Sequence, residues 1–450
     1  MIKILQVRNV DSFVESRRQK TSEKDRKIVQ AILNDVRKNG DSAVKKYERK
    51  FNGKSTSQLR VSAKEIKEAK SKISREERRA LVTQINSVDR EASLLGHGLD
   101  KAEEDYSQWW DEAKKHDNAD PFVQQLFVPI PSVGCYIPGG QARYPSSAVM
   151  SIFPALRAGV RRIVLVSPPG RDGKIDPLTI VAAKMCESKS KSVDEPLKVE
   201  IYKVGGAQAI GALAYGTKSI PKVDKIVGPG GKFVSIAKWL VSDQTAIDMV
   251  AGPTELGIIA DASSDPELVA LDLISQAEHS KDTMCFVITQ SKTMAKQIQK
   301  SIEKLVPGAE RSSIIKESIS KNGFIAVCKN QNEVIELANK IAPEHLELMV
   351  KNARALAKYR STMITGAGLL LVGKNTPSAA SDYLFGTNHI LPTNGFGRTR
   401  GGLSILDFLK LQTVVESKKS GLKAISDSLK ALTDAEGLPN HYKAVKRRLD

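Results

Sequence analysis

Histidines that stand beside carboxylate or amide residues are the part of this sequence best suited to chemistry. The chain holds six histidines. In the segment SQAEH, Gln276 and His279 are three residues apart, so a helix would present both on one face. In APEHLE, Glu344 directly precedes His345, and a carboxylate next to an imidazole can move protons near neutral pH. These segments are candidates for a metal site and an acid–base pair.

Two more histidines lie near acidic residues in the carboxyl-terminal part. Asp382 precedes His389 in the glycine-broken segment SDYLFGTNHI, and Glu436 precedes His441 in EGLPNH. Zinc accepts histidine nitrogen and carboxylate oxygen, which suits this set of residues. Amide ligands are uncommon around zinc, so spacing alone does not make Gln276 a ligand, nor does it show that these distant segments meet.

Three glycine-rich turns indicate a second, anion-binding region. They cover residues 136–140 (YIPGG), 205–208 (GGAQ) and 228–231 (GPGG). Glycine lets a ligand approach backbone N–H groups at the start of a helix, and such crevices usually lie at the carboxyl ends of parallel strands. The fingerprint G-x-G-x-x-G is absent, because Phe233 stands where its last glycine belongs. Motifs of P-loop proteins, metalloproteases and α/β-hydrolases are also missing.

Short apolar runs alternate with helical stretches over most of the chain. Strands are expected at 162–166, 199–204, 225–227, 256–259, 284–288, 323–328 and 368–373. Residues 25–39 and 63–87 are expected to be helices, with Gly96 and Gly98 ending the second helical region, and the pattern beyond residue 403 is helical. The alternation predicts an α/β fold of two lobes with partly parallel sheets flanked by helices. A helical N-terminal part and a small helical C-terminal extension complete the expected architecture.

The composition excludes several classes of protein. The chain has 450 residues, of which 41% are hydrophobic and 27% charged. We find no apolar run long enough to span a membrane and no signal peptide, and the four cysteines include no close pair. A cytoplasmic protein that does not bind membranes is expected. The net charge of +18 keeps nucleic-acid binding as an alternative, although the basic residues are mixed with acidic ones in helical stretches.

Eight segments of the chain resemble segments of the histidinol dehydrogenase family, in the same order and at similar spacing. They are SVGCYIPGG, VGGAQAIGALAYGT, VDKIVGPGG, AIDMVAGPTE, LISQAEH, IAPEHLEL, SDYLFGTNHILPT and AEGLPNH, and the resemblance extends from about residue 25 onward. It implies an NAD-dependent alcohol and aldehyde dehydrogenase that contains zinc. Its reaction would be the four-electron oxidation of L-histidinol to L-histidine through histidinal with two NAD, the final steps of histidine biosynthesis.

The resemblance also implies roles for individual residues. The catalytic pair would be Glu344 and His345. The zinc ligands would be Gln276, His279, Asp382 and His441. The substrate contacts would be Thr254, Gln276, His279, His345, Asp382, Glu436 and His441. The cofactor contacts would be made at Tyr136, Gln208 and Gly231.

The same resemblance implies a division of the chain. Residues 26–135 and 256–400 would form a first α/β lobe with the metal and substrate site, and residues 136–255 a second lobe that binds NAD on an incomplete Rossmann-like sheet. Residues 1–25 would form a helical arm. Residues 401–450 would reach the partner's site in a homodimer, so that Glu436 and His441 act across subunits.

Three departures from the family pattern affect these expectations. Gly231 stands where the family usually has Asn, so one hydrogen bond to NAD is expected to be missing. Thr254 replaces Ser but keeps a hydroxyl, and Ser280-Lys281 replaces Gly-Pro after the metal-binding histidine. Lys281 would be unfavourable near zinc unless it points to solvent.

Alternatives to this function come from the same and from other classes. A relative on the same scaffold could oxidise another small alcohol, but the retention of Glu436 and His441 favours an amino alcohol with an imidazole ring. A zinc-dependent hydrolase could use Glu344 and a bound water, and would turn over without NAD. A basic nucleic-acid-binding protein would lose affinity steeply with salt.

Overall fold

The computed structural model describes residues 1–17, 22–53, 58–115, 122–139, 143–189, 197–357 and 364–450. The chain divides into two compact units. The first unit comprises Met1–Ala92 and Ile130–Asp407, and the second comprises Ser93–Pro129 and Phe408–Asp450.

The larger sheet of the first unit has six parallel strands. They are β1 (Lys3–Gln6), β8 (Glu255–Ala260), β9 (Met284–Thr289), β10 (Phe324–Val327), β11 (His345–Met349) and β12 (Leu369–Val372). Their spatial order is β1-β10-β9-β8-β11-β12, with every neighbouring pair parallel. Because side chains alternate along a strand, the sheet has two apolar faces, and a helical layer packs on each.

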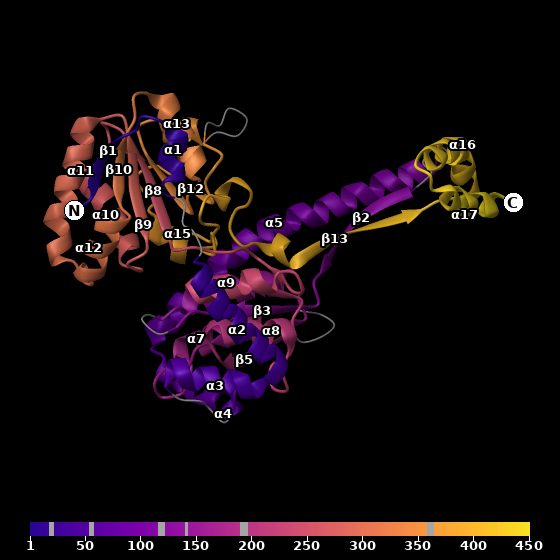
Figure 1. Cartoon of the computed structure of the whole chain (residues 1–450), viewed down its shortest axis with the longest axis horizontal. Helices are drawn as coiled ribbons and strands as arrows, with labels where there is room; N and C mark the ends of the chain where they lie inside the picture. Colours follow the sequence, from indigo (N-terminus) through magenta and orange to yellow (C-terminus); the bar gives the residue numbers. More distant parts are fainter. Residues whose placement is uncertain (18–21, 54–57, 116–121, 140–142, 190–196, 358–363) are drawn as a thin grey trace. The chain divides into compact units, whose positions relative to one another are not determined.

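Helices lie on both faces of this sheet (Figure 1). The first layer contains α10 (Pro266–Ala277), α11 (Lys292–Leu305) and α12 (Ser312–Lys321). The second contains α1 (Val10–Glu15), α13 (Gln331–Ile341) and α14 (Ala353–Leu356), whose buried side chains share one core. The buried strands therefore read as apolar runs in the sequence, as expected of a parallel sheet covered on both faces.

The smaller sheet has five parallel strands. They are β3 (Ser132–Tyr136), β4 (Arg162–Ser167), β5 (Lys198–Lys203), β6 (Lys225–Val227) and β7 (Ala246–Ile247), in the order β5-β4-β3-β6-β7. Counted along the chain this order is 3-2-1-4-5, that of a Rossmann sheet without its last strand. When β1 is left out, the strands of the larger sheet follow the same order, 3-2-1-4-5. The expected fold class is confirmed.

The first hundred residues pack differently from the prediction. Val29 and Val36 of α2 (Glu23–Asn39) lie in one core with Ile210 and Leu213 of α8 (Gly206–Tyr215), beside the five-stranded sheet. Val44 of α3 (Asp41–Asn52) joins the same core. Helices α2 and α3, which the expected division counts with the metal-site lobe, therefore pack beside the smaller sheet, because periodicity identifies an apolar face but not its partner.

Several element boundaries also differ from the prediction. The expected helix 63–87 is two helices, α4 (Ala63–Lys72) and α5 (Arg75–Lys115), and α5 continues through Gly96 and Gly98. A single glycine inside a helix costs only about 1 kcal/mol, which a long helix tolerates. β1 lies inside the expected helical arm, where it pairs with β10 through residues distant in sequence.

The second unit is built on an antiparallel ribbon. Its strands are β2 (Phe122–Pro129) and β13 (Leu409–Glu416), followed by the helices α16 (Lys419–Ala435) and α17 (Pro439–Leu449). The C-terminal extension is thus mostly helical but begins with a strand. Large apolar side chains of this unit are exposed at Leu411, Val415 and Leu432. Within the described parts of the chain, no helix combines the length and apolar character needed to cross a bilayer.

A buried ion pair fixes the turn after β6. Gly228 has a φ of 111°, and a side chain there would come within 2.2 Å of the carbonyl oxygen of Tyr136. Its N–H donates to Asp248 Oδ2 (2.8 Å), and its carbonyl accepts from Lys238 Nζ (2.9 Å). Lys238 and Asp248 pair with each other, and their side chains are 2% and 0% exposed. The glycine turn therefore rests on a charge pair inside the lobe.

We expect Lys238→Met to lower the free energy of unfolding by about 3–5 kcal/mol, because Asp248 would stay buried without its cation. Lys232→Met is the matched control on α9 (Lys232–Val241), since Lys232 is largely exposed and pairs with Asp25. Its loss should cost at most about 1 kcal/mol. Urea denaturation of both variants measures the difference, and equal losses would contradict the assignment.

Candidate active site

The candidate catalytic pair, Glu344 and His345, lies at the amino end of β11, next to the amino end of β8. In the ladder between β8 and β11, His345 is opposite Leu256. Glu344 directly precedes His345, and Thr254 lies two residues before Leu256, so both lie at the same edge of the sheet. Gln276 reaches this edge because α10 returns from the other end of β8 and ends at Ala277. Sequence positions almost a hundred residues apart thus share one edge.

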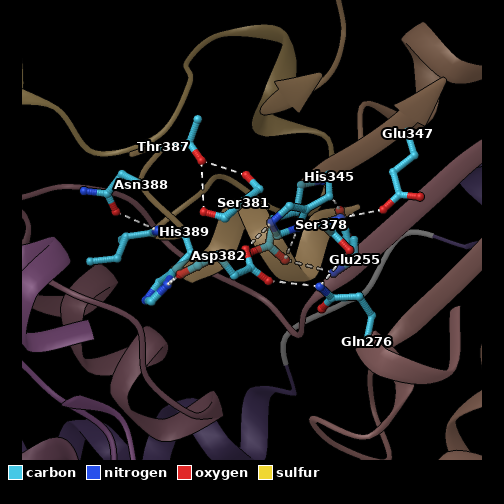
Figure 2. A network of polar contacts seen from close by, with 12 residues as sticks. Glu255, Gln276, His345, Glu347, Ser378, Ser381, Asp382, Thr387, Asn388 and His389 are labelled. Carbon is cyan, nitrogen blue, oxygen red and sulfur yellow. Dashed lines mark hydrogen bonds and ion pairs between the residues drawn. The ribbon is translucent and has the colours of Figure 1, made fainter. Parts of the chain in front are cut away.

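Asp382 joins two of the predicted site residues directly (Figure 2). Its Oδ1 lies 2.9 Å from His345 Nε2, and its Oδ2 accepts a hydrogen bond from Gln276 Nε2 (3.0 Å). Gln276 Nε2 also donates to Ser378 Oγ (3.1 Å). Gln276 and His345 are each 2% exposed. The structure therefore brings Gln276, His345 and Asp382 together in a buried polar network.

A carboxylate from β11 holds the helix that carries Asp382. This helix, α15 (Ser378–Tyr383), begins where the backbone N–H of Ser378 donates to Glu347 Oε1 (2.7 Å). Glu347 is two residues after His345, so both side chains point to the same face of the strand. Burial, together with the Asp272 carboxyl, raises the pKa of Glu347 to about 8. Sequence reasoning missed this role; its signal is a charged residue that alternates with His345 in an apolar run.

His389 fixes the other end of α15. Its Nδ1 lies 2.8 Å from the carbonyl oxygen of Asp382, which can only accept, so Nδ1 carries the proton. Nε2 of the neutral ring then accepts from the hydroxyl of Ser147 (3.0 Å) in α6 (Pro145–Arg157). Burial lowers the pKa of His389, which favours this neutral form. The histidine thus holds Asp382 through its backbone.

Burial and neighbouring charges raise the pKa values of both members of the catalytic pair, for different reasons. Burial raises the pKa of Glu344 to about 7. Burial alone would lower the pKa of His345, but the Asp382 and Glu344 carboxylates outweigh it and raise the pKa to about 9. His345 Nδ1 lies 4.0 Å from Glu344 Oε2, too far for a hydrogen bond, and has no partner in the described residues. An unpartnered imidazole nitrogen therefore lies near a carboxyl group that changes its protonation state close to neutral pH.

The predicted cofactor contacts lie at the carboxyl ends of the smaller sheet. Gly206 N donates to the hydroxyl of Tyr136 (3.1 Å), and Glu48 Oε1 accepts from both Gly205 N and Gln208 Nε2 (2.8 Å each). Gln208 Oε1 is buried and without a partner among the described residues. The structure thus brings Tyr136 and Gln208 together, and Glu48 is a contributor that the sequence did not indicate.

Gly231 caps the amino end of α9, after β6. A side chain added at Gly231 would meet nothing within 4 Å, so the absence of Asn there leaves open space. Because β3 and β6 are neighbours at the point where the strand order reverses, their carboxyl ends flank the usual ligand crevice of this topology.

Comparison with known proteins decides the family. The model of the family described as histidinol dehydrogenase matches residues 15–449. The chain belongs to the histidinol dehydrogenase family. It is therefore an oxidoreductase, which confirms the predicted class of enzyme.

Individual members of the histidinol dehydrogenase family are similar to this chain over nearly its whole length. The histidinol dehydrogenase of Methanococcus maripaludis is 41% identical over 423 residues, covering 94% of this chain and 93% of that protein. That of Bacillus licheniformis is 37% identical over 429 residues, covering 95% and 94%. The crystal structure of histidinol dehydrogenase from Elizabethkingia anophelis superimposes with a TM-score of 0.84 at 31% identity, covering 100% of this chain and 98% of that one.

The resemblance to this family implies zinc, and one orphaned atom tests whether the site suits it. Gln276 Oε1 is buried and has no hydrogen-bond partner among the described residues. An unpaired buried carbonyl oxygen is unfavourable, and a cation would satisfy it. The Asp382 carboxylate, which bonds the same amide, offers oxygen of the kind zinc accepts. The residues present therefore fit a divalent cation.

His279 adds an imidazole to the same region. Its ring keeps an exposed surface, yet partial burial lowers its pKa and favours the neutral form that binds metals. In the described parts of the chain, no three His, Cys, Asp or Glu side chains gather closely enough to hold a metal alone. The predicted set therefore depends on the amide of Gln276 and on a further ligand.

Two of the predicted site residues belong to the second unit, and Lys281 belongs to the first. Glu436 and His441 belong to the second unit, where both are exposed, so their contribution to the site stays a prediction. Lys281 is 60% exposed and pairs with Glu317 (2.6 Å). Its charge therefore points to solvent, and this departure from the family pattern does not oppose a metal.

We expect Gln276→Leu to weaken zinc binding by at least about 10–100-fold, because the variant removes the orphaned oxygen at nearly constant volume. Competition with a chelating dye measures the affinity. Gln299→Leu is the matched control, since Gln299 bonds Ile2 O (2.8 Å) outside the site. Unchanged zinc affinity in Gln276→Leu would remove this residue from the ligand set.

Proposed function

We propose that this chain is a zinc-dependent histidinol dehydrogenase that oxidises L-histidinol through histidinal to L-histidine with two NAD. The family membership supports the substrate, and the observation that carries the chemistry is the buried Glu344–His345 pair. His345 is hydrogen-bonded to Asp382, which also binds Gln276, so proton acceptors and candidate metal ligands form one network. This activity would complete histidine biosynthesis.

In the proposed reaction, NAD and zinc supply part of the chemistry, and the residues of the chain supply the proton transfers. When bound, NAD would accept the hydride, and zinc, which Gln276 and Asp382 would help to hold, would anchor the substrate. The first oxidation removes the hydroxyl proton and a hydride from the alcohol carbon, and His345 is placed to take that proton. The Asp382 carboxylate that raises the His345 pKa is itself a candidate zinc ligand, so a cation there would weaken this effect and favour the neutral ring.

The second oxidation needs a water that adds to the aldehyde. Glu344 is placed to take the proton of that water, and the resulting hydrate releases the second hydride. Burial brings the pKa of Glu344 to about 7, close to the pH at which a general base works best. Bulk water is largely excluded from both side chains, since Glu344 and His345 are 7% and 2% exposed.

We propose a homodimer in which Glu436 and His441 complete the partner's site. The exposed apolar side chains Leu411, Val415 and Leu432 of the second unit support an interface with another chain. Retention of Glu436 and His441 favours histidinol over another small alcohol. We place the enzyme in the cytoplasm, where the four free, buried cysteines remain reduced.

We expect two NADH for each L-histidinol consumed, followed by absorbance at 340 nm with product analysis. A metal chelator should abolish the reaction, because it would remove the cation that the Gln276 and Asp382 oxygens are proposed to bind. Added zinc should restore the reaction. A yield of one NADH would point to an alcohol dehydrogenase of the same family. Turnover without NAD would support the hydrolase alternative instead.

We expect His345→Asn to slow both oxidations and Glu344→Gln to slow mainly the oxidation of histidinal, by about 10²–10⁴-fold in each case. With histidinal as substrate, the rate should fall as the pH drops through about 7, because Glu344 becomes protonated and can no longer accept the water's proton. Glu344→Gln should lose this limb of the pH profile. Full-rate conversion of histidinal by Glu344→Gln would refute the assignment.

A further inference from the structure

Glu255 and Glu344 bind each other's backbone at the amino edge of the larger sheet. Glu255 N donates to Glu344 Oε2 (2.9 Å), and Glu344 N donates to Glu255 Oε2 (3.3 Å). The first pair of the β8–β11 ladder is Leu256 with His345, one residue further along each strand. The two carboxylates therefore satisfy the N–H groups that precede the ladder, as the reciprocal bonds of a capping box do for a helix.

The other oxygen of Glu255 fixes a turn beside the site. Glu255 Oε1 accepts from Asn394 N (3.0 Å), and Asn394 has a φ of 55°. The preceding residue, Thr393, accepts from Gly252 N through its hydroxyl. One side chain thus connects β8, β11 and the turn at residues 393–394 (Figure 2 shows Glu255 within the network).

Two adjacent buried acids are an unfavourable choice for a purely structural contact. Glu255 and Glu344 are 6% and 7% exposed, and burial raises the pKa of Glu255 to about 8. Apolar residues would pack such an edge at lower desolvation cost. Paired acids of this kind are characteristic of functional sites.

We propose that Glu255 is a positioning residue for Glu344. Its carboxylate fixes the Glu344 backbone, and its own N–H holds Glu344 Oε2. Among the described residues, the bond from Glu255 N to Oε2 is the hydrogen bond that the Glu344 carboxylate accepts. Its Oε1 is therefore left for the water that adds to the aldehyde. The inference rests on the proposed function of Glu344 in aldehyde oxidation.

The test is Glu255→Ala, assayed separately with histidinol and histidinal. We expect kcat for histidinal to fall about 10–100-fold, the loss typical of a displaced catalytic group, with KM for histidinal and the first oxidation little changed. Glu255→Gln keeps one acceptor oxygen and should lose less. It also serves as the near-isosteric variant if Glu255→Ala fails to fold.

Glu200→Gln is the matched control. Glu200 is likewise a 6% exposed strand carboxylate, but it bonds Arg162 and Tyr202 in the smaller sheet. Its loss is expected to change stability without separating the two oxidations. Equal slowing of both oxidations in Glu255→Ala, or no slowing, would overturn the proposal.

A double-mutant cycle separates this inference from the proposed function. If Glu255 acts through Glu344, the double variant Glu255→Ala/Glu344→Gln should oxidise histidinal no more slowly than Glu344→Gln alone. Multiplied losses would overturn the positioning role. Normal histidinal oxidation by Glu344→Gln would instead refute the proposed function, on which the cycle depends.

Discussion

The carboxylate of Asp382 is the interaction on which the candidate site depends. One oxygen contacts His345 and the other accepts from Gln276, so a single group sets the position of a proton acceptor and of a candidate metal ligand. It is itself held from both sides, since Glu347 bonds the start of its helix and His389 bonds its carbonyl. Loss of any of these contacts would therefore disturb the positions of both His345 and Gln276.

The two sheets share a strand order but use opposite ends. In the smaller sheet, the glycine turns follow the carboxyl ends of β3 and β6, which is the usual ligand crevice of this topology. In the larger sheet, Glu255, Glu344 and His345 gather at the amino ends of β8 and β11. There the leading N–H groups of the strands face side chains instead of a ligand, and the carboxylates that satisfy them become part of the site.

The sequence predicted the elements with a regular apolar pattern and the segments that carry the family resemblance. Buried strands such as β4 and β9 appear as apolar runs, and the segments around Gln276 and Glu344 carry the family resemblance. The strand β11 escaped prediction because Glu347 interrupts its apolar pattern. The packing of α2 on α8 escaped because an apolar face does not identify its partner.

The roles of Glu48, Glu255 and Glu347 are set by contacts between positions far apart in the chain. Glu48 bonds Gln208 across 160 residues, and Glu255 bonds Glu344 across 89. No local spacing encodes such pairs, and a lone glutamate in a sequence is usually a surface residue. These carboxylates become visible as functional groups only once the fold places them.

The burial of the cysteines affects how the protein reacts with oxidants. All four are buried, and burial raises the pKa of each thiol, so little thiolate forms and peroxide reacts with them slowly. The candidate metal site draws on oxygen and nitrogen atoms, so no sulfur ligand stands to be lost by sulfenic acid formation. Sulfenic acid formation, which disables thiolate-ligated zinc enzymes, would therefore remove no ligand from the candidate metal site.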